Sequence, residues 1–216
     1  MRASLRSIKQ ARMATVGKTP RIPQVLLRRV NRVRSRYAPT GDTEEEMFDD
    51  FFVLWRAYES TYRMRGASRQ QSFEATVEAI DYAGFVKLKS LQKWARAMGH
   101  FREANIATLS EWFSTESLTA VKAREYQERI ARVVQAAQAP DRWHRRDSES
   151  LARILYDIRC AVMHSGLETG NALALRILNP LRPALVELVV ARAARGGGMS
   201  FSDAQAEFDS HLEAQR

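Results

Sequence analysis

Apolar residues recur every three or four positions along most of this chain, and that period predicts amphipathic helices. The stretch from 47 to 62 shows the period well. Thr43 and Glu46 precede it with the spacing of a capping box, so a helix should begin there. Its apolar face consists of Met47, Phe51, Leu54, Trp55, Tyr58 and Tyr62.

The same pattern predicts further helices and leaves no convincing strand or internal repeat. A helix from near Ser72 should be interrupted at Gly84 and resume up to Gly99. Ser148 is a candidate N-cap for a later helix, and a last long apolar helix should be bent or divided at its prolines. We therefore expect an all-α bundle. The remaining predicted segments are a short helix at 106–113, a long helix from Leu118 to Ala137, and the last helix at 170–195 with Asn179-Pro180 and Pro183.

Charge is distributed unevenly along the 216 residues. The formal net charge is +9, and residues 1–41 hold eleven of the 34 basic residues and no acidic residue. The remainder, with 23 basic and 25 acidic residues, is close to neutral. We expect a basic arm over 1–41, a helical domain over 42–195, and a glycine hinge with a short amphipathic tail over 196–216.

The basic arm attracts polyanions, because cationic side chains contact phosphates and release counterions. Three interpretations stay open: a nucleic-acid-binding tail, a solvated or partner-docking extension, and an organelle-targeting peptide. A short helix from Val25 to Val33 is predicted within the arm. The candidate RNA-binding residues on it are Arg28, Arg29, Arg32, Arg34 and Arg36.

Several classes of site are disfavoured by composition. The single cysteine, Cys160, rules out an internal disulfide and a thiolate-rich zinc site, and indicates a reducing compartment such as the cytoplasm. Four scattered histidines argue against structural zinc, so we expect no metal and no cofactor. No apolar run approaches the roughly 20 residues that span a bilayer, so no membrane association is expected.

The stretch "YDIRCAVMHSG", residues 156–166, carries the candidate chemistry. Arg159 and His164 lie about 140° apart on a straight helix, so their side chains do not converge. They would converge if the last turn loosens at Ser165-Gly166, or if two chains each contribute one residue. Histidine can move the proton of a ribose hydroxyl, and arginine can bind the phosphate. The alternative is that both are ordinary polar residues on a packed helix.

This stretch resembles the signature of the HEPN family, an arginine followed after four to six residues by a histidine on the penultimate long helix of a bundle. "LARILYDI" before it, the closing apolar helix, and "FFVLWRAYESTYR" at 51–63 fit the same pattern, over about residues 44–195. The resemblance implies a metal-independent endoribonuclease of a bacterial toxin–antitoxin or antiviral defence system. It also implies a homodimer with a composite cleft, RNA as substrate, and a cognate antitoxin or defence-complex partner. His164 would be the general acid and base, and Arg159 the phosphate binder.

One position departs from the family, because Cys160 stands where a polar residue usually follows the arginine. Asp157 either orients His164 or pairs with Arg153. The alternative functions are a catalytically inactive HEPN-like bundle that binds RNA or a partner, and a structural component of a ribonucleoprotein.

The segment "DRWHRR" at 141–146 is a second candidate RNA contact. Trp143 would stack on bases beside Arg142, Arg145 and Arg146. The alternative is a solvated charged loop.

Overall fold

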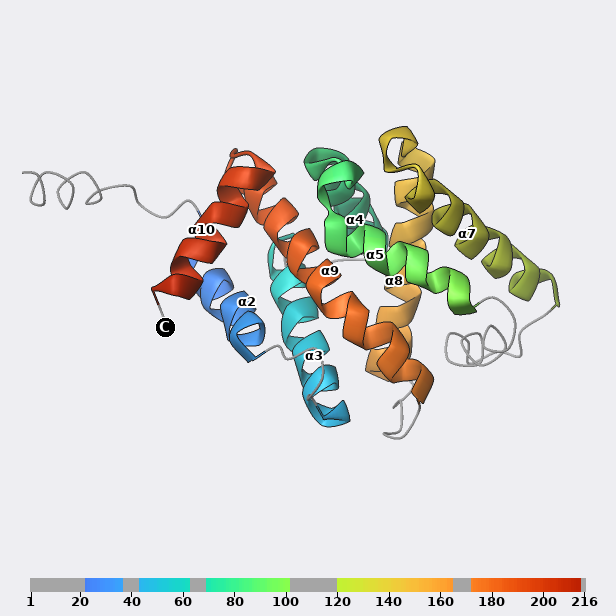
Figure 1. The fold of residues 1–216 in the computed structure, drawn as a ribbon, viewed down its shortest axis with the longest axis horizontal. Helices are drawn as coiled ribbons and strands as arrows, with labels where there is room; N and C mark the ends of the chain where they lie inside the picture. The colour runs from blue at the N-terminus through green and yellow to red at the C-terminus, as the bar shows by residue number, and fades with distance from the viewer. Residues whose placement is uncertain (1–21, 37–42, 63–68, 102–119, 165–171, 215–216) are drawn as a thin grey trace, which may run out of the picture.

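Every regular element that the structure describes is helical. The computed structural model describes residues 22–36, 43–62, 69–101, 120–164 and 172–214 (Figure 1). Eight α-helices and three short 3-10 helices make up these segments, which confirms the expected all-α class. The α-helices are α2 (Gln24–Arg36), α3 (Glu44–Ser60), α4 (Arg69–Ala83), α5 (Lys89–Ala97), α7 (Ala120–Gln138), α8 (Arg145–His164), α9 (Ala172–Gly196) and α10 (Phe201–Glu213). The 3-10 helices are η1 (Phe85–Lys87), η2 (Met98–Phe101) and η3 (Pro140–Arg142).

Helix α9 forms the centre of the bundle. It packs against α3, α4, α5 and α10, while α8 packs against α4 and α7 on one side (Figure 1). Because α9 has neighbours around much of its circumference, its sequence is apolar on most faces rather than along one stripe. Pro180 and Pro183 lie inside it, yet the helix continues through both, so it is not divided there.

The helix ends follow local signals in the sequence. Thr43 Oγ1 accepts the backbone N–H of Glu46 at 3.3 Å, and Glu46 Oε2 accepts that of Thr43 at 2.8 Å, which confirms the capping box. Gly84 adopts a φ of +77° between α4 and η1, a conformation that favours glycine, and this confirms the interruption. The helix expected at 106–113 lies outside the described residues.

The start of α8 differs from the prediction. Helix α8 begins at Arg145, three residues before the expected N-cap Ser148. Asp147 Oδ2 accepts the backbone N–H of His144 at 2.9 Å and so satisfies a donor at this end. Ser148 instead lies within the helix, where its hydroxyl donates to Asp81 of α4 at 2.8 Å.

Helix α2 belongs to the core rather than to a separate arm. The helix predicted over 25–33 forms, but it packs on α3 and α10. The division expected at residue 41 therefore does not isolate the basic helix from the body. Its apolar side chains are buried in the main core, and with Ile22, two residues before the helix, they are Ile22, Leu26, Leu27, Val30 and Val33.

The C-terminal tail is also part of this core. Gly198 has a φ of +59° in the turn before α10, which places α10 back against α9 and α2. Phe208 and Ala204 of α10 are fully buried. Asn31 of α2 donates to the backbone oxygen of Phe208 at 2.9 Å, so the two ends of the chain are held together.

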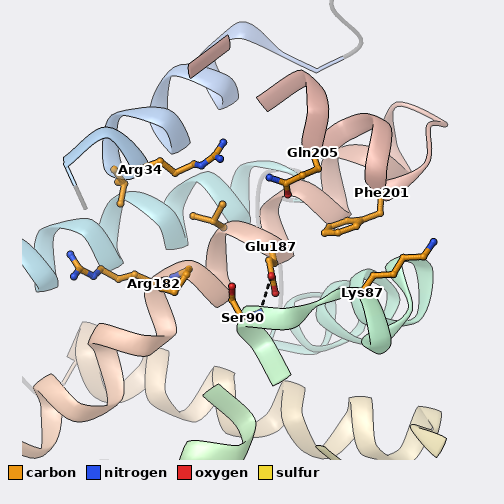
Figure 2. A pocket seen from close by; sticks show the side chains of 10 residues that line it. Arg34, Lys87, Ser90, Arg182, Glu187, Phe201 and Gln205 are labelled. Carbon is orange, nitrogen blue, oxygen red and sulfur yellow. Dashed lines mark hydrogen bonds between the residues drawn. The ribbon is translucent and has the colours of Figure 1, made fainter. Parts of the chain in front are cut away.

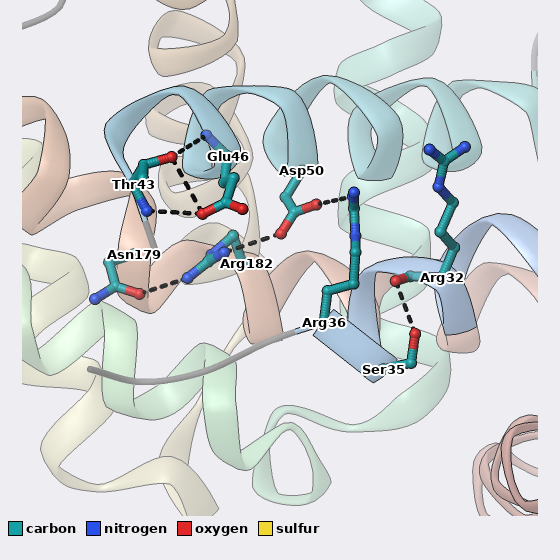
Figure 3. A network of polar contacts seen from close by, with 8 residues as sticks. All are labelled: Arg32, Ser35, Arg36, Thr43, Glu46, Asp50, Asn179 and Arg182. Carbon is teal, nitrogen blue, oxygen red and sulfur yellow. Dashed lines mark hydrogen bonds and ion pairs between the residues drawn. The ribbon is translucent and has the colours of Figure 1, made fainter. Parts of the chain in front are cut away.

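A buried charged network joins α2, α3 and α9 (Figure 3). Arg182 of α9 has a side chain only 1% exposed, and its guanidinium lies 2.9 Å from Asp50 of α3. Asp50 also accepts from Arg36 of α2 at 2.8 Å, and Asn179 accepts from Arg182 at 2.9 Å. This arginine sits between the two prolines of α9 and is buried, so its charge requires a partner.

Among the described helices, none combines the length and apolar character that crossing a bilayer demands.

Candidate functional site

Arg159 lies on α8 with its side chain turned toward α3. Its Nη2 is 3.4 Å from Oε1 of Glu59, and the two side chains are only 15% and 13% exposed. The same Glu59 oxygen accepts the indole N–H of Trp55 at 3.0 Å. The arginine of the motif is thus held near the surface by a carboxylate from another helix, which limits its freedom to move.

His164 is the last residue of α8, and its side chain lies outside the described part of the structure. The backbone of α8 is continuous from Arg159 to His164. Five helical positions separate the two residues by about 140° around the axis and about 7.5 Å along it. Within one chain the helix therefore directs these two positions to different sides, as the sequence predicted for a straight helix.

The two supporting candidates occupy unremarkable environments. Asp157 pairs with Arg153 one turn earlier, with Nε and Oδ2 3.6 Å apart, which is the alternative that the sequence left open for it. Cys160 is a free thiol of intermediate exposure. Tyr126 of α7 packs beside this part of α8, and its pKa is raised by burial and further by the Asp157 carboxylate.

The five arginines of α2 divide into two groups. Arg28, Arg29 and Arg32 are exposed, and no carboxylate of the described residues pairs with them. Arg34 forms an ion pair with Asp209 of α10, and Arg36 pairs with Asp50. Because both charges are already matched, these two side chains attach α2 to its neighbours and are poorly placed to bind RNA.

The segment from 141 to 146 also differs from the expected stacking platform. The Trp143 ring stacks on Phe85 with centroids 3.5 Å apart and an interplanar angle of 14°. Its indole N–H donates to Ser148 at 2.9 Å, so the ring packs against the body rather than facing solvent as a free platform. The expectation that Trp143 stacks on bases is therefore not supported by its position.

The arginines around Trp143 remain at the surface. Arg142 and Arg146 are exposed. Arg145 is also exposed but lies 3.3 Å from Asp81 and 3.5 Å from Glu149, which reduces its net contribution to a positive patch.

The two groups of candidate RNA-binding arginines are not gathered into one surface. Helix α2 lies with α10 at one end of the molecule, whereas α7 and α8 lie toward the other end (Figure 1). An RNA that contacts both groups in one chain would have to pass along the body between them.

Sequence reasoning missed Glu59, the residue that holds the motif arginine. A signal was present, since Glu59 follows Trp55 by four positions and so lies next to the aromatic face of α3. An acidic residue at the border of an aromatic stripe indicates a cationic partner on a neighbouring helix. The helix that supplies that cation is determined by tertiary packing, because Arg159 lies 100 positions after Glu59 in the sequence.

Within the described residues, no group of three or more histidine, cysteine, aspartate or glutamate side chains is arranged to hold a metal ion. A scan against protein-family models and searches of curated proteins and of solved structures found no match to this chain. Any functional assignment therefore has to be argued from the residues themselves.

Proposed function

We propose that this protein is a HEPN-like, metal-independent endoribonuclease in which Arg159 and His164 act on one phosphodiester. The observation that carries the proposal is the position of both residues near the C-terminal end of one long helix that precedes the apolar α9. This is the arrangement that the resemblance to the HEPN family implies. A role in a bacterial toxin–antitoxin or antiviral system, with RNA as substrate in the cytoplasm, follows from the same resemblance.

The course of α8 favours a site formed by two chains. Since the helix directs positions 159 and 164 to different sides, one chain does not bring the two side chains together by helix geometry alone. A homodimer in which α8 of one chain faces α8 of the other would place an arginine of one chain beside a histidine of its partner. Such a composite cleft requires no change in the helix.

In that cleft histidine takes the proton of the ribose 2′-hydroxyl, and the 2′-oxygen attacks the phosphorus. The bond from phosphorus to the 5′-oxygen breaks, and a protonated histidine supplies the proton for the leaving oxygen. The products are a 2′,3′-cyclic phosphate and a free 5′-hydroxyl. Arginine stabilises the charge that grows on the phosphate oxygens in the transition state.

The catalytic histidine is tested by RNA cleavage in the presence of EDTA. We expect His164→Ala to lower the cleavage rate by about 10²–10⁴-fold, because general acid–base catalysis contributes on that order. The matched control is His144→Ala, since His144 is exposed at the other end of α8 and should leave the rate unchanged. Equal rates for the two variants would contradict the assignment, as would loss of all cleavage by the wild-type protein in EDTA.

A second candidate function, a binding module without catalysis, is favoured by the ion pair between Arg159 and Glu59. A phosphate would have to compete with this carboxylate for the guanidinium. Glu59→Gln separates the two functions, because removal of the negative charge should maintain or raise the rate of a ribonuclease. In a binding module the same variant would alter RNA affinity or stability, with no cleavage in either protein.

The contribution of α2 to RNA affinity is tested without disturbing the core. Arg28, Arg29 and Arg32 are exposed, so a triple substitution by glutamine removes three charges and no buried contact. We expect weaker RNA binding and a log–log salt slope shallower by up to about 2 on single strands, from about 0.7 per lost phosphate contact. Fluorescence anisotropy between 50 and 200 mM salt measures both.

The control for this triple variant is Arg124→Gln with Arg132→Gln, two exposed positions on α7 at the other end of the molecule. An unchanged slope in the α2 variant would assign the basic helix to docking or targeting instead of RNA binding.

A further inference from the structure

A pocket of about 410 Å³ opens where α2, α9, α10 and the start of α5 meet (Figure 2). Its walls include the apolar side chains of Val33, Pro183, Val186 and Phe201. A volume of this size accepts a small organic molecule. None of the lining residues belongs to the candidate ribonuclease motif on α8, so this pocket is separate from the site of the proposed function.

Glu187 of α9 supplies the charged group inside this pocket. Its two carboxylate oxygens accept the backbone N–H groups of Ser90 and Leu91, each at 2.9 Å. These bonds cap α5, whose own N-cap residue Leu88 makes no side-chain bond. Burial nevertheless raises the pKa of Glu187, and the backbone hydrogen bonds offset this only in part. The Ser90 hydroxyl and the Lys89 backbone N–H also act on this carboxylate and lower its pKa.

The negative charge of Glu187 has no cationic partner among the described residues, although three cations line the same pocket. Arg34 is paired with Asp209, and Arg182 is paired with Asp50. Lys87 is exposed, and its ammonium group points away from Glu187 (Figure 2). The half-buried carboxylate forms no ion pair with the described cations around it, and a ligand could supply one.

Gln205 provides a second acceptor on the opposite wall. Its Nε2 donates to Asp209 at 3.2 Å, which can only accept, so the side-chain oxygen of Gln205 is fixed in the other direction. Figure 2 shows Gln205 on α10 near the ring of Phe201, while the Glu187 carboxylate on α9 is directed toward Ser90 at the start of α5. Two acceptors and an aromatic ring are the groups that recognise organic ammonium ions.

We propose that this pocket binds a small organic cation, a primary ammonium group carried on an apolar body. The ammonium group donates to Glu187 and to the oxygen of Gln205, and the ring of Phe201 attracts the same charge. The apolar body packs against Val33 and Val186. A neutral ligand lacks the positive charge that the half-buried carboxylate attracts, and an anionic ligand would be repelled by that carboxylate.

The test uses three probes of similar shape and different charge: 2-phenylethylamine, 2-phenylethanol and 3-phenylpropanoate. Titrations into the full chain, followed by calorimetry and by amide NMR shifts, give the affinities and the binding position. We expect the amine to bind at least tenfold more tightly than the alcohol and to shift amides around Ser90 and Phe201. Tighter binding of the alcohol or the carboxylate would overturn the proposal, as would no binding of the amine at millimolar concentration.

Two variants locate the binding in this pocket. Glu187→Gln should lower the affinity for the amine at least tenfold. Glu125→Gln, at an exposed position on α7, should leave that affinity unchanged. Because Glu187 also caps α5, Val186→Trp serves as a second variant that fills the pocket and leaves the cap intact. Amine binding that survives Val186→Trp with unchanged affinity would place the ligand elsewhere and refute the proposal.

Discussion

Removal of residues 1–36 is expected to unfold the protein, not only to weaken any contact with RNA. The deletion takes away α2 and Ile22, which together place five apolar side chains in the core. Each fully buried aliphatic side chain stabilises a fold by about 1.5–3 kcal/mol. Their sum is comparable to the whole stability of a typical domain, about 5–15 kcal/mol. The charge pattern alone suggests the opposite, that the segment can be removed from a neutral body without harm.

A single substitution measures the same effect in a protein that still folds. We expect Leu27→Ala to lower the free energy of unfolding by about 2–5 kcal/mol in urea denaturation, since Leu27 is 1% exposed. Val25→Ala on the same helix is the control, because Val25 is 57% exposed and its loss should cost less than about 0.5 kcal/mol. Similar midpoints for the two variants would show that α2 is an appendage after all.

Asp50→Asn is expected to lower the free energy of unfolding by about 3–5 kcal/mol, because it removes the negative charge that lies 2.9 Å from the buried guanidinium of Arg182. The substitution conserves size, so the loss reflects charge rather than packing. Arg36, the second partner of Asp50, is half-exposed and can turn to water at little cost. Urea denaturation with an unchanged slope would report this loss as a shift of the midpoint to lower urea.

The neighbouring Asp49 offers a matched control for this prediction. Asp49 is exposed, so Asp49→Asn should leave the midpoint within error of the wild type. The double variant Asp50→Leu with Arg182→Met should recover much of the loss, since well-packed apolar residues often replace a buried ion pair without penalty. A stable Asp50→Asn single variant would show that Arg182 does not depend on this carboxylate.

The helices themselves were predicted from the sequence because their signals are local. The capping box at Thr43 and Glu46, the break at Gly84 and the apolar period of α3 and α7 all act within a few residues. Such interactions form between neighbours in the chain, so their effect can be judged without knowledge of the fold. The start of α8 was misplaced by four residues, because the helix begins after His144 and not after Ser148, and Asp147 in its first turn accepts the His144 backbone N–H.

The roles of charged and aromatic side chains could not be predicted in the same way. Trp143 was assigned to RNA from its basic neighbours, but Phe85, nearly sixty positions earlier, packs against its ring. Arg34 was assigned to RNA as well, and Asp209 at the other end of the chain neutralises it. A charge or a ring has no fixed role until its spatial neighbours are known, and those neighbours are remote in sequence.

The sequence by itself determined the all-α class, most helix boundaries, the excess of positive charge near the N-terminus and the angle between Arg159 and His164 on one helix. Only the tertiary structure decided that the basic helix α2 lies in the core, that Glu59 holds Arg159, and that Glu187 lines a pocket together with Arg34, Lys87 and Arg182. The physical reason is the separation in sequence between the residues that interact. Helix period and capping depend on contacts within about four residues, whereas burial and ion pairing depend on which helices pack together.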